Sequence, residues 1–153
     1  MNDNLRAFLW MIRECEGTAE DDGYQAMFGY PMAGRTFTDF ADHPRRKFPF
    51  KQTDGTMNYT TAAGAYQEIV PTFNRLTRKL GTVGFDPEVQ DQHAAELIAE
   101  AGAMADVKNG NLRAAIDKCS GVWASLPASK YPQPKRTYAF AENAYLQSGG
   151  KLS

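Results

Sequence analysis

The sequence predicts an α+β fold in which one helix, a small antiparallel sheet and a larger helical region follow one another. Apolar residues in the first sixteen positions recur at helical spacing, residues 17–59 are rich in Gly, Pro and aromatic residues, and helical patterning dominates from Thr60 onward. We expect one domain, residues 1–153. Its sheet lobe spans about 17–59, its helical lobe spans about 60–149 together with the N-terminal helix, and a cleft lies between them.

The first helix is expected to begin at a cap formed by Asn2, Asp3 or Asn4 and to end at Glu16. Gly17 follows directly, and glycine commonly stops a helix because it adopts the left-handed conformation. The apolar stripe that defines the helix follows the i, i+3, i+4, i+7 pattern and comprises Leu5, Phe8, Leu9 and Ile12.

Short strands are expected at residues 24–30, 35–40 and 47–52, where aromatic and β-branched residues stand between turn residues. Helical segments follow. Pro71 should end or kink the first at Val70, because proline removes a backbone donor. Asp86 and Asn111 are candidate caps for later helices. The expected helical ranges are 62–80, 87–108, 112–119 and 134–149, with Trp123 and Leu126 packed among them.

Composition and charge argue against several classes of partner. The 17 Lys and Arg residues nearly balance the 18 Asp and Glu residues, so the net charge of -1 provides no long-range attraction to nucleic acid. The N-terminus lacks the pattern of a signal peptide, and no apolar run reaches the roughly 18 residues of a membrane helix. The sequence therefore predicts a soluble, cytosolic and monomeric chain with no nucleic-acid partner.

The cysteines and histidines are expected to be structural. Cys15 and Cys119 are too few and too far apart for a disulfide framework, so both are interpreted as buried free thiols. His43 and His93 lack the spacing of metal ligands. We expect no metal and no cofactor.

Glu16 is the strongest candidate for catalysis that the residues alone provide. The ordinary structural interpretation is that Glu16 is a solvent-exposed glutamate at a frayed helix end. However, Glu16 continues the apolar stripe and lies at the negative end of the helix dipole. Both features disfavour the ionised carboxyl and suit a general acid. From position alone, catalysis and solvation are equally good interpretations.

Cleavage of a glycosidic bond is one reaction that needs a general acid, and it normally also uses a second carboxylate as base or nucleophile. The sheet region offers several candidates, but each lies in a good turn sequence, where aspartate commonly caps the backbone. The structural interpretation is favoured for every one of them, and least firmly for Asp39. The candidates are Asp21, Asp22, Asp39 and Asp42.

Several stretches resemble the lambda-type phage endolysins, which are lysozyme-like lytic transglycosylases. The matching stretches are "CEGT", Gly23-Tyr24, "FTDFADHPR", "TTAAGAYQ", "DPEVQDQHA", "AAIDKCSGVWASLP" and "YPQ", which run in order over most of the chain. The resemblance implies a lysozyme-like fold with the substrate cleft between its lobes. It also implies cleavage of the β-1,4 bond between N-acetylmuramic acid and N-acetylglucosamine in peptidoglycan.

The resemblance further implies that Glu16 is the single catalytic acid and base. The muramic acid C6 hydroxyl would close onto C1 and leave a 1,6-anhydro end, so no second carboxylate is needed to activate water. The enzyme would wait in the host cytoplasm until a separate holin opens the membrane, and would then reach the cell wall.

Two alternatives stay open at this point. One is a hydrolytic muramidase that uses Glu16 with Asp39, although Gln25 and Pro31 occupy the positions where hydrolytic phage lysozymes carry Asp and Thr. The other is an inactive cell-wall binding module or tail-associated protein.

Substrate-binding candidates combine aromatic faces for sugar rings with amide or hydroxyl groups for their substituents. Gln67 is the best polar candidate, whereas Tyr66 fits a core aromatic equally well. The chain departs from the family at Cys15, at Thr60 and at Ala65, which replaces an Arg. The basic run 45–47 fits a solvated loop better than an anion site. The binding candidates are Tyr24, Asp39, Thr60, Tyr66, Gln67, Tyr131 and Gln133.

Overall fold

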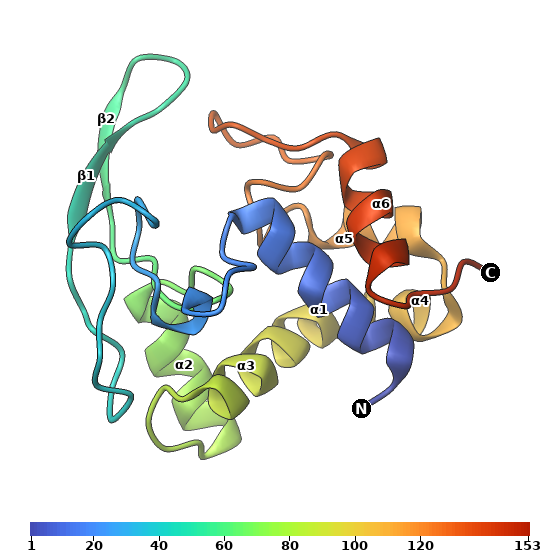
Figure 1. Cartoon of the computed structure of the whole chain (residues 1–153), viewed down its shortest axis with the longest axis horizontal. Coiled ribbons are helices and arrows are strands. Elements are labelled where there is room, and N and C mark those ends of the chain that lie inside the picture. Colours follow the sequence, from blue (N-terminus) through green and yellow to red (C-terminus); the bar gives the residue numbers. More distant parts are fainter. The chain divides into compact units, whose positions relative to one another are not determined.

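The computed structural model describes all of residues 1–153, and its elements confirm the α+β class (Figure 1). None of its helices has the length and hydropathy needed to span a membrane. The elements are α1 (Asp3–Glu16), the 3-10 turn η1 (Gly23–Gln25), β1 (Phe48–Lys51), β2 (Met57–Thr60), α2 (Val70–Leu80), α3 (Pro87–Glu100), α4 (Met104–Asn109), α5 (Leu112–Cys119) and α6 (Tyr138–Gln147).

The chain forms two compact units. We call residues 1–15 with 94–153 the helical unit, and residues 16–93 the hairpin unit. The helical unit holds α4, α5 and α6 together with nearly all of α1, and the hairpin unit holds β1, β2 and α2. Helix α3 contributes its first seven residues to the hairpin unit and the rest to the helical unit.

Helix α1 forms as its sequence predicts. Asn2 Oδ1 accepts hydrogen bonds from the backbone N–H groups of Asn4 and Leu5, which are two of the donors that a helix start leaves unpaired. The predicted apolar stripe is buried, and Phe8 and Ile12 have no exposed surface. Gly17, at φ +79°, has the left-handed conformation and ends the helix immediately after Glu16. The predicted helix and its stop are confirmed.

The sheet is smaller than predicted. Strands β1 and β2 form one antiparallel hairpin in which Phe48 pairs with Thr60 and Lys51 pairs with Met57. The strands predicted at 24–30 and 35–40 are wrong, because the two segments share only one bridge, between Ala26 and Thr36. Backbone hydrogen bonds from Tyr30 to Met27 and from Met32 to Gly29 fold residues 27–32 into successive turns. These N–H and carbonyl groups are therefore not available for pairing with a neighbouring strand.

Helix α2 begins at Val70, where the sequence predicted that a helix over 62–80 would end or be kinked. Pro71 lies in the first turn, which tolerates proline because the first four amide groups of a helix have no partner inside it. The preceding segment, predicted as helix from residue 62, is a loop in which Gly64 and Gln67 have positive φ angles of +81° and +50°. Such angles are incompatible with a right-handed helix.

Two of the later helices differ from the prediction, whereas α5 has the predicted bounds, Leu112–Cys119. The helix expected over 87–108 is divided into α3 and α4, with Gly102 in the left-handed conformation between them. Asn111 is at the N-cap position of α5, as predicted, but its side chain makes no capping hydrogen bond there. Helix α6 begins at residue 138 rather than 134, because the Thr137 hydroxyl accepts the Phe140 N–H and caps it there.

The helical unit has its own buried core. Trp123 and Leu126 are buried in it, which confirms their predicted packing role, and both cysteines are buried and free, as predicted. Other large side chains of this core are Phe8, Met11, Ile12, Ile98, Ile116 and Tyr145.

Cys119 should be inert toward thiol reagents in the folded protein. It has no exposed surface, and burial raises the pKa of its thiol to about 12. Because the thiolate is the reactive form, a Cys15→Ser variant should not react with an aromatic disulfide reagent at about pH 8 until denaturant unfolds it. Rapid labelling of the native variant would contradict this burial.

Candidate active site

Glu16 is the last residue of α1, and its side chain is partly buried. Gly17 and Thr18 follow it, and Thr18 is almost completely buried, with 1% of its surface exposed. The Thr18 hydroxyl donates a hydrogen bond to the backbone carbonyl of Ala65. The segment that carries the candidate acid is therefore joined to a loop almost fifty residues further along the chain.

That loop, residues 60–68, contains the whole of the motif "TTAAGAYQ" and is tightly folded. Ala63 and Glu68 pair through two backbone hydrogen bonds, and Gly64 donates its N–H to the Ala26 carbonyl at 2.7 Å. The Gln67 side chain donates from Nε2 to the Gly64 carbonyl at 3.0 Å. The left-handed backbone of Gln67 is unusual for a residue with a side chain, and such conformations gather at functional sites.

The side chain of Gln90 in α3 forms hydrogen bonds to this loop and to two neighbouring segments. Its Oε1 accepts the Ala65 N–H at 2.8 Å, and its Nε2 donates to the carbonyls of Phe85 and Tyr24 at 2.8 and 3.0 Å. Only 1% of Gln90 is exposed, and its bonds to Ala65 and Phe85 are buried, while its bond to Tyr24 is partly buried. The side chain thereby connects three loop segments to the start of α3.

Asp91, the next residue of α3, joins two of the predicted binding tyrosines. Its Oδ1 accepts hydrogen bonds from Tyr24 Oη at 2.8 Å and from Tyr66 Oη at 2.6 Å. The two rings meet edge to face, with centroids 6.4 Å apart. Burial and the neighbouring Asp91 carboxylate both raise the pKa of Tyr66. Tyr66 is only 4% exposed, which favours the packing interpretation that the sequence left open.

Both histidines are buried in the hairpin unit and have polar partners. His43 Nδ1 accepts the Arg45 N–H at 2.9 Å, so Nε2 carries the proton and donates to the Glu68 carbonyl at 2.7 Å. His93 Nδ1 lies 2.7 Å from Glu68 Oε1, and its Nε2 lies 2.8 Å from Thr82 Oγ1. Burial raises the pKa of Glu68. The histidines thus fix Glu68 at the end of the 60–68 loop.

The His43 environment predicts a pH-dependent stability. Burial lowers the pKa of His43 below its ordinary value of 6.5, so the unfolded chain binds the proton more readily than the folded one. The resulting stabilisation is complete above pH 6.5 and is lost as the pH falls through the folded pKa. We expect the free energy of unfolding to fall by up to about 1.4 kcal/mol per pH unit in that range.

Urea unfolding of the wild type and of His43→Gln at several pH values between about 5.5 and 7.5 measures this effect. Glu68 is present in both proteins, so its opposite contribution, a loss of stability with rising pH above 4.5, cancels in the comparison. The wild type should show the steeper decline toward acid pH. If the free energy of unfolding falls equally steeply with decreasing pH in both proteins, the pH dependence does not come from His43.

The acidic residues of the sheet region make local structural contacts. Asp39 Oδ1 accepts the Ala41 N–H at 2.8 Å, which is a turn-capping bond. Asp42 forms an ion pair with Arg45 at 2.9 Å, and this contact lowers the pKa of the Asp42 carboxyl. Asp22 accepts a hydrogen bond from the Tyr30 hydroxyl. Asp39, Asp42 and Asp22 are all exposed on the surface of their segments.

The remaining binding candidates lie in both units. Thr60 ends β2, and its hydroxyl accepts the Ala62 N–H at 3.1 Å. Tyr131 and Gln133 belong to the loop before α6 in the helical unit, where the Tyr131 hydroxyl donates to the Gly121 carbonyl at 2.7 Å. The structure therefore brings Tyr24, Tyr66 and the 60–68 loop together around α3, whereas Tyr131 and Gln133 form a second, local group.

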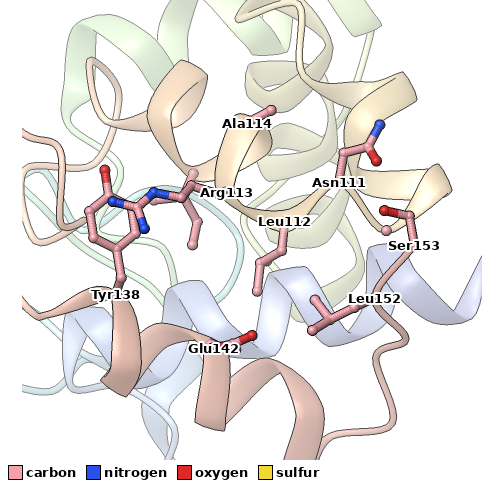
Figure 2. A pocket seen from close by; sticks show the side chains of 10 residues that line it. Asn111, Leu112, Arg113, Ala114, Tyr138, Glu142, Leu152 and Ser153 are labelled. Atoms are coloured by element: carbon pink, nitrogen blue, oxygen red, sulfur yellow. The ribbon is translucent and has the colours of Figure 1, made fainter.

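A separate cavity of about 520 Å³ lies in the helical unit (Figure 2). Figure 2 shows Leu112 and Leu152 pointing into it and Arg113 packed over the ring of Tyr138, with the guanidinium 3.8 Å from the ring centroid. None of the predicted catalytic or binding residues lines this cavity. Its lining comprises Gly110, Asn111, Leu112, Arg113, Ala114, Ile116, Tyr138, Glu142, Leu152 and Ser153.

Comparison with solved structures identifies the class of fold. A structure described as bacteriophage lambda lysozyme complexed with a chitohexasaccharide superposes with a TM-score of 0.88 at 33% identity, covering 100% of this chain and 98% of that one. A second structure, lysozyme from bacteriophage lambda, gives a TM-score of 0.81 at 31% identity, with coverages of 100% and 98%. The fold is that of a lysozyme, as the sequence predicted.

Comparison of sequences identifies the family. A family model for endolysins matches residues 6–152. The endolysin of Escherichia phage lambda is 36% identical, over 99% of this chain and 95% of the relative. The endolysin of Escherichia phage P2 is 32% identical, over 97% and 94%. The chain belongs to the endolysin family, whose lysozyme-type members degrade bacterial cell wall.

Proposed function

We propose that this endolysin is a lytic transglycosylase in which Glu16 acts first as acid and then as base. The observation that carries the proposal is the position of Glu16, partly buried at the carbonyl end of α1 and directly before the left-handed Gly17. A carboxyl at the carbonyl end of a helix lies where the helix dipole disfavours negative charge, which is the position expected of a general acid. Membership of the endolysin family supplies the substrate class, which is the glycan strand of peptidoglycan.

The proposed reaction uses one carboxyl in two steps. Glu16 protonates the oxygen of the β-1,4 bond between N-acetylmuramic acid and N-acetylglucosamine, and the bond to C1 breaks. The Glu16 carboxylate then takes the proton of the muramic acid C6 hydroxyl while that oxygen bonds to C1. The products are a free N-acetylglucosamine 4-hydroxyl and a 1,6-anhydro end. Glu16 ends in its starting protonation state, and no water is consumed.

The local contacts of Asp39 support this reaction over a muramidase that pairs Glu16 with Asp39. Asp39 is exposed and accepts the Ala41 N–H, so its carboxylate performs the turn-capping role that the sequence allowed for it. An internal C6 hydroxyl held beside C1 also needs no second carboxylate to activate it, because its effective concentration is very high.

We further propose that the predicted binding residues contact the glycan. Gln67 would use its side-chain amide, and Thr60 and the rings of Tyr24 and Tyr131 would contact sugar substituents and faces. The buried Tyr66 would support the Tyr24 ring through Asp91 and through the contact between the two rings. The lambda lysozyme structure contains a chitohexasaccharide, which supports glycan binding by a chain of the same fold. As in the sequence-based expectation, the enzyme acts as a monomer that reaches the wall through membrane holes made by a holin.

Mass spectrometry of digested peptidoglycan tests the reaction type. The wild type and an Asp39→Asn variant should both release 1,6-anhydro-muropeptides, which lack one water relative to hydrolytic products. Products with reducing ends alone would establish a muramidase. A failure of the wild type to release any muropeptide would favour an inactive binding module.

A further inference from the structure

A continuous line of buried hydrogen bonds leads from helix α3 to the residue after Gly17. Gln90 Oε1 accepts a hydrogen bond from the Ala65 N–H, and the Ala65 carbonyl accepts one from the Thr18 hydroxyl. Thr18 and Gln90 are each 1% exposed, and Ala65 has no exposed surface. Because buried polar groups are costly to leave unpaired, each bond in this line holds its neighbour in a single arrangement.

The Ala65 carbonyl is a fixed point, because the loop around it cannot shift easily. Gly64 has φ +81°, and a Cβ at this position would lie 2.4 Å from Gln90 Oε1 and 2.9 Å from Phe85 Cζ. The Gln90 side chain therefore lies directly against the loop backbone. Its two Nε2 hydrogen bonds to Phe85 and Tyr24 prevent it from rotating away.

Gly17 provides no such restraint on the chain that follows Glu16. A Cβ at Gly17 would meet nothing within 4 Å, so glycine is favoured here by its positive φ angle and not by a close contact. The chain can pivot at a glycine more freely than at any other residue. Two residues after Glu16, the Thr18 hydroxyl attaches the chain to the fixed Ala65 carbonyl of the hairpin unit through a long-range hydrogen bond.

We propose that Thr18 and Gln90 are positioning residues for Glu16. Thr18 fixes the direction in which the chain leaves α1, and Gln90 fixes the carbonyl to which Thr18 attaches. Together they hold the Glu16 carboxyl in the orientation that proton transfer requires, since small misplacements of a catalytic group reduce turnover strongly. This inference rests on the proposed role of Glu16 and assigns no contact with substrate to either residue.

The sharpest test removes the Thr18 hydroxyl and keeps its shape. Thr18→Val should lower kcat for peptidoglycan cleavage about tenfold to a hundredfold, while KM stays within about threefold. Thr18→Ser retains the donor and should keep kcat within about threefold of the wild type. A change in Gln90 would leave three backbone groups without partners at once, so its effect on orientation is harder to separate from its effect on folding.

Thr82→Val is the matched control, because it removes another hydroxyl of the hairpin unit, one that lies 2.8 Å from His93 Nε2. All variants are assayed where circular dichroism shows them to be folded, and Thr82→Val should keep the wild-type kcat. An equal loss in Thr82→Val and Thr18→Val would show a general effect of destabilisation and would overturn the proposal, as would a wild-type kcat in Thr18→Val.

Glu16→Gln, assayed in parallel, separates the two proposals. If it is inactive while Thr18→Val has the wild-type kcat, only the positioning role fails. If Glu16→Gln retains full turnover, the proposed role of Glu16 fails, and the positioning role fails with it.

Discussion

Replacement of Glu16 by Gln should lower the rate of peptidoglycan cleavage by about a hundredfold to ten-thousandfold, the usual contribution of general acid and base catalysis. The amide keeps the size of the side chain but cannot donate the proton that the leaving oxygen needs. Because Glu16 ends α1 and is only partly buried, the substitution should leave the fold intact. Release of muropeptides from purified cell wall, measured over time, gives the rate.

Glu14→Gln is the matched control for this experiment. It removes a carboxyl from the same helix, two residues before Glu16 and also partly buried, and should change the rate by less than about threefold. Similar losses in both variants would indicate that the charge of the helix end matters rather than Glu16 itself. A Glu16→Gln enzyme of wild-type activity would remove the assignment of the acid.

Replacement of His93 by Ala should cause a large loss of stability in the hairpin unit. His93 is completely buried against Glu68, with Nδ1 and Oε1 2.7 Å apart. Removing one partner leaves a cavity and a buried carboxyl without its hydrogen bond, and breaking such pairs costs about 3–5 kcal/mol. Urea unfolding followed by circular dichroism measures the free energy of unfolding.

The exposed ion pair between Asp3 and Arg6 provides the comparison. Its atoms are also close, at 2.9 Å, but the two side chains are 82% and 61% exposed. Asp3→Asn should therefore change the free energy of unfolding by less than about 1 kcal/mol. A loss in His93→Ala no greater than the loss in Asp3→Asn would show that the Glu68 and His93 contact contributes little to the fold.

The parts of the fold that sequence predicted well are those with strong local signals. The apolar stripe of α1 and the glycine after it correctly placed both helix ends. Pro71 misled the prediction, because the same residue can end one helix or occupy the first turn of the next. The 60–68 loop has small, helix-compatible residues, and its non-helical form depends on bonds to distant residues such as Gln90 and Ala26, which the local sequence does not reveal.

The candidate site was predicted in part. Glu16 emerged because it extends an apolar stripe, and the same argument applies to α3, where Gln90 and His93 precede the buried Ala94 and Leu97 by one helical turn each. Polar residues on an inward stripe were thus the available signal for the groups that hold the loop. Thr18 gave no such signal, because its partner lies 47 residues away in the sequence.

Digestion in water labelled with heavy oxygen tests the central claim most directly. A hydrolase must place one oxygen atom from solvent at C1 of the muramic acid it releases. The proposed transglycosylase places the C6 oxygen of the same sugar there. We predict 1,6-anhydro-muropeptides without solvent oxygen at C1, from the wild type and not from Glu16→Gln. Muropeptides whose new ends all carry the heavy oxygen would contradict the account.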